Sequence, residues 1–220
     1  MKIKFLLFFL LLALLASSLQ AKVFYRGENA KQIALTFDDG PNAYVTAQIL
    51  DILKKENVHA TFFVVGKKLD ATAFLLRRMV EEGHEIGNHT YSHSPITWIN
   101  DEKLANELKK TSLLITKYAS REVNLFRPPH GRLTKAKQKI VSQRGYHTIM
   151  WTVNADDFYH TQGGMRTANS IANKVDRGVV GGDIVLMHDN SQQIIEALPM
   201  IIKNLKRRGF RFVTVSNMIR

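Results

Sequence analysis

The 220-residue sequence predicts a single α/β domain in which about seven parallel strands form a closed or distorted β/α barrel. Apolar, strand-like runs alternate with amphipathic helical runs along the chain, which implies parallel strands joined by crossover helices. These strands are short and mostly apolar, as expected when both faces of a sheet are covered. No repeat, linker or low-complexity tract divides the chain after its first 21 residues. An open, doubly wound sheet is the alternative architecture.

In the first half of the chain, we expect strands over 33–37, 60–65 and 84–87, and helices over 44–56, 71–82 and 101–119. Gly40 and Pro41 break the chain after the first strand, and Gly83 ends the second helix. The longest helix begins near Asp101 and carries an apolar stripe that includes Leu104 and Leu108.

In the second half, we expect strands over 124–126, 146–153, 183–187 and 210–215, and helices over 134–144, 167–175 and 192–208. Gly145 and Gly209 follow two of these helices, as is typical of helix ends. The run over 183–187 is strongly apolar, as expected of a buried strand.

The first 21 residues have the pattern of a secretory signal peptide, and the folded domain is expected to cover 22–220. Lys2 and Lys4 precede an apolar run over 5–16, and small residues follow it. The run is short for a transmembrane helix. A retained N-terminal membrane anchor is the alternative, and either interpretation predicts an exported protein.

Charge and composition limit the class of protein. The net charge is +12, and such a basic exported chain suits anionic surroundings such as cell-wall polymers or lipid head groups. Lys and Arg are spread along the chain without a nucleic-acid recognition motif, so no nucleic-acid partner is expected. The sequence has no cysteine, which excludes disulfides and thiolate chemistry and leaves His, Asp and Glu as metal ligands.

Two adjacent carboxylates, Asp38 and Asp39, follow the first expected strand in the stretch 36–41. The carboxyl ends of parallel strands are where α/β enzymes place their chemistry. The alternative is a turn that caps the following helix, because Asp and Gly are ordinary turn residues. The decision depends on whether later strands also end in reactive side chains.

His89 and His93 follow the third expected strand and are four residues apart. This spacing is a known zinc geometry, and Asp39 as a third ligand would leave a coordination position open for water. Two loop histidines without a metal are the alternative.

The stretch 127–131 contains two prolines, which fix the backbone before His130. The His130 N–H is therefore a candidate oxyanion donor, and Arg127 could hold a carboxylate by a bidentate pair. A rigid turn with a surface arginine is the alternative.

Two further strands end in polar residues. The stretch 151–158 places Asp156 and Asp157 beside aromatic residues, and a helix cap or solvated loop is the alternative. His188 follows the apolar strand over 183–187, where it would lie at the mouth of a pocket or be an ordinary core histidine. Together, five strands end in Asp, His or Arg, which favours a common site.

These five stretches, in this order, resemble the motifs of polysaccharide deacetylases of carbohydrate esterase family 4, the NodB homology domain. The resemblance extends from about Ile33 to Met218. It implies a distorted β/α barrel and a metal-dependent hydrolase that removes N-acetyl groups from polysaccharides containing N-acetylglucosamine. Peptidoglycan is favoured over chitin or poly-N-acetylglucosamine because the chain is basic and expected to be exported.

The resemblance also implies roles for individual residues. Asp39, His89 and His93 would bind the metal, usually zinc, although such ligands also accept cobalt or nickel. Asp38 would be the general base, oriented by Arg127. His188 would be the general acid, oriented by Asp157. The substrate-binding residues would be His130, Leu186, Trp151 and Phe158, with Leu186 lining the acetyl pocket.

The chain departs from the family pattern at four positions. Asn154 stands where Asp is usual, Phe158 where Trp is usual, His130 where Tyr is frequent, and Ser94 separates the second motif from its proline. Asp156 competes with Asp157 for the acid-orienting role. Two other functions therefore stay open: an exported glycan-binding protein without catalysis, and a deformylase or amidase of the same superfamily that acts on a lipid-linked or small substrate.

Overall fold

The computed structural model describes residues 22–158, 160–161 and 164–220. The expected signal peptide or anchor at 1–21 lies outside the described residues. The strands are β1 (Val23–Phe24), β2 (Gln32–Asp38), β3 (Thr61–Val64), β4 (Glu85–Asn88), β5 (Leu125–Phe126), β6 (His147–Ile149), β7 (Val153–Asn154), β8 (His160–Thr161), β9 (Gly164–Met165), β10 (Ile184–His188) and β11 (Arg211–Phe212).

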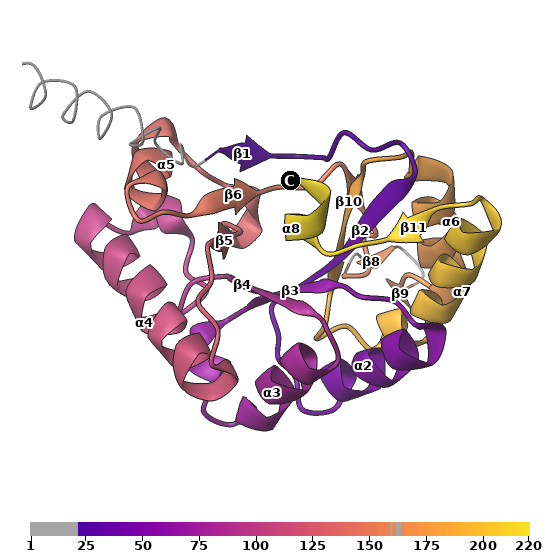
Figure 1. Ribbon diagram of the computed structural model, residues 1–220, viewed down its shortest axis with the longest axis horizontal. Coiled ribbons are helices and arrows are strands. Elements are labelled where there is room, and N and C mark those ends of the chain that lie inside the picture. The colour runs from indigo at the N-terminus through magenta and orange to yellow at the C-terminus, as the bar shows by residue number, and fades with distance from the viewer. Residues whose placement is uncertain (1–21, 159, 162–163) are drawn as a thin grey trace, which may run out of the picture.

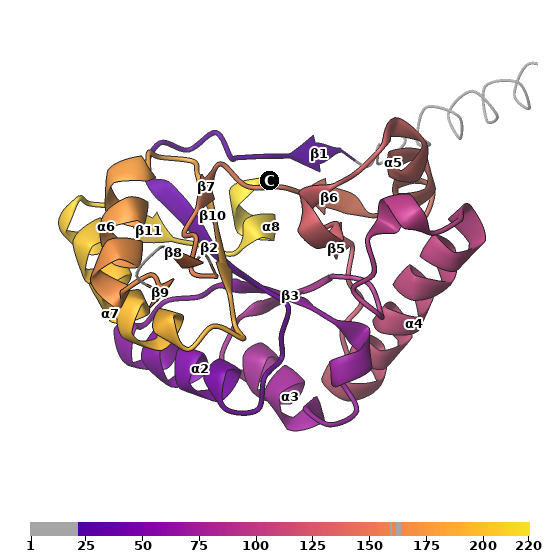
Figure 2. The same ribbon diagram turned by 180° about the vertical axis from the view of Figure 1, so that it is seen from behind.

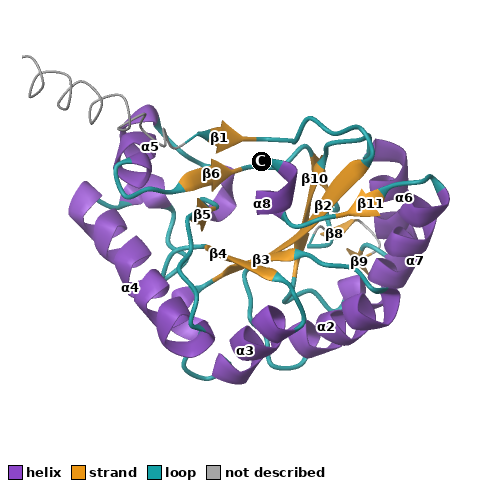
Figure 3. Cartoon of the chain, viewed as in Figure 1, coloured by secondary structure: helices purple, strands orange, loops and turns teal. Residues whose placement is uncertain are grey.

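The α-helices are α2 (Val45–Glu56), α3 (Ala73–Glu81), α4 (Asp101–Ala119), α5 (Lys135–Ser142), α6 (Ala168–Gly178), α7 (Gln193–Arg207) and α8 (Val215–Met218). Three short 3₁₀ helices, η1 (Gly66–Lys68), η2 (Ile96–Trp98) and η3 (Pro129–Gly131), lie in the connections. Figure 3 shows the long helices on the outside of the strands, which is the layer order of a β/α barrel.

The main sheet has the strand order β1-β6-β5-β4-β3-β2-β10-β7, with β11 paired to β2, and its paired strands are parallel. The sheet curls into a partial barrel (Figure 1), as the sequence predicts. Because β1 and β7 lie at the two ends of this order, strand pairing does not close the barrel among the described residues.

The prediction of one continuous strand over 146–153 is wrong. It divides into β6, which pairs with β5 and β1, and β7, which pairs with β10 at the other end of the sheet. The three residues between them cross the opening of the barrel. The Met150 N–H donates to Phe24 O at 2.7 Å and the Thr152 N–H to Ile184 O at 3.1 Å. One straight strand could not reach both edges, so the chain bends where the barrel would otherwise close.

Side chains alternate between the two faces of the central strands. Ile33, Leu35 and Phe37 of β2 belong to the large core between the sheet and helices α2, α3, α6 and α7. Ala34, also on β2, faces the barrel interior and shares a second core cluster with Val215 of α8. Since alternation continues along the strand, Asp38 also faces the interior.

Helix α8 fills the barrel interior near the strand starts, and the Val215 N–H donates to the Thr61 hydroxyl at 3.0 Å. It replaces the end of the expected last strand over 210–215, of which β11 is the part that forms. Strand β1 and the antiparallel hairpin β8–β9 were not predicted, because two-residue strands carry no readable periodicity. Figure 2 shows β7 and β10 together at one side of the barrel, with α6 and α7 outside them.

Among the described residues, no helix combines the length and the apolar character needed to span a bilayer.

Candidate active site

The carboxylate of Asp38 and the imidazole of His188 start from neighbouring positions. β2 and β10 are adjacent parallel strands, and their register places Asp38 opposite His188. Both residues end their strands on the interior face, which is why two positions far apart in sequence share one site. The placement of His188 at the mouth of the barrel agrees with the sequence-based expectation.

Arg127 is completely buried and holds Asp38. Its Nη1 donates to Asp38 Oδ1 and to the Thr36 hydroxyl, both at 2.7 Å. Its Nε and Nη2 donate to the carbonyl oxygens of Ile149 and Met150 at 3.1 Å. Burial lowers the pKa of Arg127, and the Asp38 charge opposes that shift. Arg127 is thus no surface arginine, and its pair with Asp38 uses one donor nitrogen instead of the expected bidentate geometry.

Asp39, His89 and His93 form a compact group of potential metal ligands. One ligand atom from each lies within 4.8 Å of the others. Asp39 Oδ1 is 3.4 Å from His89 Nε2 and 2.9 Å from His93 Nε2. Burial acts to raise the pKa of Asp39, but hydrogen bonds and charge from the two histidines outweigh it and hold that pKa well below its usual range. The group is therefore ready to present an ionised carboxylate.

The chemistry of these donors fits a divalent transition metal. His89 Nδ1 lies 2.7 Å from Arg127 O, and because a carbonyl only accepts, Nδ1 carries the proton. In the metal-bound form, the neutral ring would then present its Nε2 lone pair on the side of Asp39, in place of the hydrogen bond to that carboxylate. Such fixing of the ligating nitrogen by a backbone carbonyl is typical of metal-binding histidines. Two imidazoles and one carboxylate suit zinc, cobalt or nickel.

Three site residues have left-handed backbone conformations. The φ angles are 75° for Asp39, 61° for His93 and 60° for His130. Such values are uncommon outside glycine and persist where the surroundings enforce them. Their concentration at one end of the barrel indicates a functional site.

His188 is paired with Asp157. Its Nδ1 lies 2.9 Å from Asp157 Oδ1, and its backbone N–H donates to Asp157 Oδ2 at 2.9 Å. Burial lowers the pKa of His188, but the hydrogen bond and charge of Asp157 outweigh it, so the pKa is raised. Asp156 instead pairs with Lys174 and Arg166 on the other side of the loop. Of the two competing carboxylates, Asp157 is the one on His188.

The expected substrate-binding residues surround this group. The Phe158 ring meets the His188 ring edge-on at 4.5 Å between centroids, and Leu186 lies two residues before His188 on the interior face of β10. The His130 ring lies 4.9 Å from that of His93. Trp151 packs against Gly131, where a Cβ would approach its ring to 2.5 Å.

The His130 N–H is a free donor. The N–H groups that close η3 belong to Gly131 and Arg132, which donate to Pro128 O and Pro129 O. Among the described residues the His130 N–H has no acceptor. The geometry thus leaves it available, as the two prolines predicted.

Sequence reasoning missed Glu107, which holds the histidine loop. Its Oε2 accepts from the backbone N–H groups of Tyr91 at 2.8 Å and Ser92 at 2.6 Å, and its Oε1 accepts from the Ser92 hydroxyl. Glu107 is buried on α4 between Leu104 and Leu108. An acidic residue on the apolar face of a predicted helix was the available signal.

Asp189 is a second missed residue, and it supports the loop of Asp38 and Asp39. Its buried Oδ2 accepts from the Thr46 hydroxyl at 2.7 Å, and burial raises its pKa to about 7. A Cβ at Gly40 would lie only 1.9 Å from that oxygen, so only glycine fits there. The sequence shows the glycine, but the contact across 149 residues depends on the fold.

The chain belongs to the polysaccharide deacetylase family, because the family model "Polysaccharide deacetylase" matches residues 25–149. A peptidoglycan-N-acetylglucosamine deacetylase of Bacillus cereus is 40% identical over 195 residues, which are 87% of this chain and 90% of the relative. The peptidoglycan-N-acetylmuramic acid deacetylase PdaC of Bacillus subtilis is 36% identical over 86% of this chain and 39% of its own length. These relatives support a hydrolytic deacetylase.

Solved structures agree with this assignment. The crystal structure of a peptidoglycan N-acetylglucosamine deacetylase superposes with a TM-score of 0.84 at 34% identity, covering 90% of this chain and 92% of that one. A CE4 family pseudoenzyme from Bacillus anthracis has the same TM-score at 30% identity, covering 92% of this chain and 70% of that one. The fold and the family are thereby shown, and the presence of a pseudoenzyme makes the individual side chains decisive for activity.

Proposed function

We propose that the chain is a metal-dependent hydrolase that removes N-acetyl groups from N-acetylglucosamine-containing polysaccharide, with peptidoglycan as the favoured substrate. The observation that carries this proposal is the constellation at one end of the barrel. A candidate metal triad lies beside a carboxylate fixed by Arg127, and the neighbouring strand places a histidine fixed by Asp157 opposite that carboxylate. These are the groups that hydrolysis of an amide requires.

Asp39, His89 and His93 would hold the metal, most simply zinc, with cobalt or nickel as alternatives. A bound divalent metal would lower the pKa of a water molecule and polarise the acetyl carbonyl.

Asp38 acts as the general base that accepts a proton from the attacking water. Its Oδ1 is held by Arg127, while its Oδ2 lies on the side of the triad, 3.8 Å from His89 Nε2. One oxygen is therefore used for positioning and the other faces the reacting groups. Because Arg127 is anchored by two carbonyls, it fixes the carboxylate without needing to move.

His188 acts as the general acid that gives its proton to the amine as the amide bond breaks. An amine leaves poorly unless it is protonated, and a protonated imidazole is a suitable donor. The raised pKa of His188 keeps the ring charged closer to neutral pH. Since Nδ1 is bound to Asp157, Nε2 is the atom that meets the substrate.

The remaining residues bind the substrate. The free His130 N–H stabilises the oxyanion of the tetrahedral intermediate. Leu186 lines the acetyl pocket, and Phe158 and Trp151 supply aromatic surface for the sugar. The smaller Phe158 ring, where relatives of this family usually carry Trp, would leave a wider sugar pocket.

The favoured substrate is peptidoglycan for two reasons. The relatives described above carry peptidoglycan in their names, and the chain has a net charge of +12. An N-terminal stretch with signal-peptide character supports export to the cell wall, with or without a retained anchor. The basic surface would then favour association with an anionic wall or membrane surface.

Acetate release tests this proposal. The purified protein with added zinc is incubated with peptidoglycan, chitin oligomers and poly-N-acetylglucosamine, each with and without a chelator. We expect chelator-sensitive acetate, most from peptidoglycan, and far less from the Asp38→Asn variant. No acetate from any glycan, with metal bound and the protein folded, would contradict the proposal and favour a binding protein or an amidase of small substrates.

A further inference from the structure

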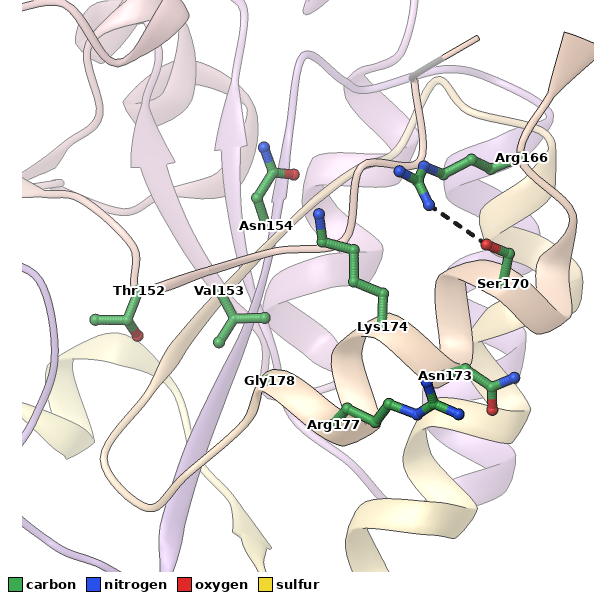
Figure 4. A pocket seen from close by; sticks show the side chains of 9 residues that line it. All are labelled: Thr152, Val153, Asn154, Arg166, Ser170, Asn173, Lys174, Arg177 and Gly178. Carbon is green, nitrogen blue, oxygen red and sulfur yellow. Dashed lines mark hydrogen bonds between the residues drawn. The ribbon is translucent and has the colours of Figure 1, made fainter. Parts of the chain in front are cut away.

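An open groove of about 940 Å³ runs between the edge strand β7 and helix α6, apart from the metal triad (Figure 4). Thr152, Val153 and Asn154 form one wall, and side chains of α6 and the residues before it form the other. β7 ends the strand order of the main sheet, so among the described residues no further strand covers this wall.

The groove is cationic. Arg166, Lys174 and Arg177 line it, and Asp156 is the carboxylate that faces two of them. Asp176, the acid next to Arg177 in sequence, pairs with Arg208 instead. Within the described part of the chain, one carboxylate therefore pairs with two of these three cations, and Arg177 makes no ion pair.

Two of these cations have unused donors. The Arg166 Nε is buried, and none of the described residues accepts from it. Arg177 is exposed and makes no ion pair with any residue that the structure describes. Figure 4 shows the side chains of Arg166, just before α6, and Lys174, on α6, extending into the same space. Asn154 lies opposite them. Guanidinium groups with free donors are the preferred partners of carboxylates.

The groove is linked to the candidate active site by the loop after β7. Asp156 pairs with Lys174, which lines the groove, and its backbone N–H donates to the groove residue Asn154 at Oδ1, at 2.9 Å. The next residue, Asp157, holds His188. A glycan bound at His188 could therefore continue along the barrel surface past the cations of the groove.

We propose that this groove binds carboxylate groups attached to the glycan substrate, and so makes the protein prefer an anionic acetylated glycan over a neutral one. The inference rests on the proposed function for its substrate and deepens it. Peptidoglycan carries free carboxylates on its stem peptides and on any lactyl group that bears no peptide, whereas chitin and its oligomers carry none. The positive charge of the groove, in addition to the shape of the sugar pocket, would then make the protein bind peptidoglycan in preference to chitin.

Binding to insoluble glycans tests the groove without requiring catalysis. The protein is sedimented with peptidoglycan from which phosphate polymers have been removed, and with chitin, at about 50 mM and about 300 mM salt. We expect stronger binding to peptidoglycan, weakened by salt, and salt-insensitive binding to chitin. Binding that depends on the phosphate polymers, or that is equal on both glycans, would overturn the carboxylate assignment.

Arg177→Gln is the test variant, because the side chain is exposed and its loss breaks no ion pair. Affinity for stripped peptidoglycan should fall about two- to fivefold, the usual weight of one exposed ion pair. The double variant Lys174→Gln/Arg177→Gln should lose about tenfold. Lys203→Gln, an exposed lysine of α7 outside the groove, is the matched control and should bind as the unaltered protein does.

Rates complete the test. The ratio of acetate release from soluble peptidoglycan fragments to that from chitin oligomers should fall in Arg177→Gln and stay constant in Lys203→Gln. Equal losses on both substrates, or no loss on either, would overturn the inference. If the unaltered protein releases no acetate but binds peptidoglycan through Arg177, the proposed function fails and the groove stands. If it releases acetate and neither binding nor rate depends on Arg177, the proposed function stands and the groove inference fails.

Discussion

The candidate active site and the cationic groove lie on two sides of one loop, yet they pair their charges differently. In the active site, Asp38 is fixed by Arg127 and His188 by Asp157, so each reacting group has a dedicated partner. In the groove, Asp156 is shared by Lys174 and Arg166 and leaves cationic charge over. Preorganised pairs suit proton transfer, whereas excess charge suits binding of a ligand of opposite sign.

The largest expected effect comes from the metal triad. His93→Ala removes one of three ligands, so activity should become undetectable and metal content should fall with it. Activity assays and metal analysis of the same sample would check this. If the His93→Ala variant kept both its activity and its metal content, the active site would not depend on the candidate metal ligands, and the contrast with the groove would fail.

Asp38→Asn should lower the turnover rate by about 10²- to 10⁴-fold, the usual contribution of a general base. The amide keeps an oxygen that accepts from Arg127, so the fold and the metal content should be preserved. The measurement is the rate of acetate release with added zinc, against thermal unfolding as the control. Near-normal turnover would assign the base to another group.

Asp157→Asn tests the pair that holds His188. The pKa of His188 is lowered by burial and raised more strongly by Asp157, so without that carboxylate it should fall. The protonated form is the active one, and the alkaline limb of the pH–rate profile should therefore move to lower pH, with a loss of up to about 10²-fold at the optimum. An unmoved limb would mean that His188 is not the acid.

Asp156→Asn is the matched neighbour and has the smallest expected effect. It removes the negative charge that pairs with two cations of the groove, and it keeps a residue that tolerates the φ of 55° at this position. Affinity for stripped peptidoglycan should rise about twofold, and the alkaline limb should stay in place. A limb shifted as in Asp157→Asn would show that the two carboxylates do not have separate roles.

The sequence predicts well which site residues lie at the ends of strands. Asp38, Arg127 and His188 each follow a short apolar run, His89 follows the expected strand over 84–87, and parallel strands bring such positions to one end of a barrel. Apolar runs, glycines and caps are local signals, which explains why the helices and the central strands agree with expectation.

Features that depend on distant pairing could not be predicted. The break between β6 and β7 follows from which strand each half meets, and nothing in 146–153 records that choice. Glu107 and Asp189 support site loops through contacts that exist only after folding. The choice between Asp156 and Asp157 likewise required the direction in which each side chain leaves the loop.

The most direct test of the central claim is a zinc titration of the metal-free protein, with acetate release measured on the same samples. The account predicts zinc binding and activity in the unaltered protein, zinc binding with a strongly lowered rate in Asp38→Asn, and neither binding nor activity in His93→Ala. An unaltered protein that releases acetate without binding metal, or a His93→Ala variant that still binds and turns over, would contradict it.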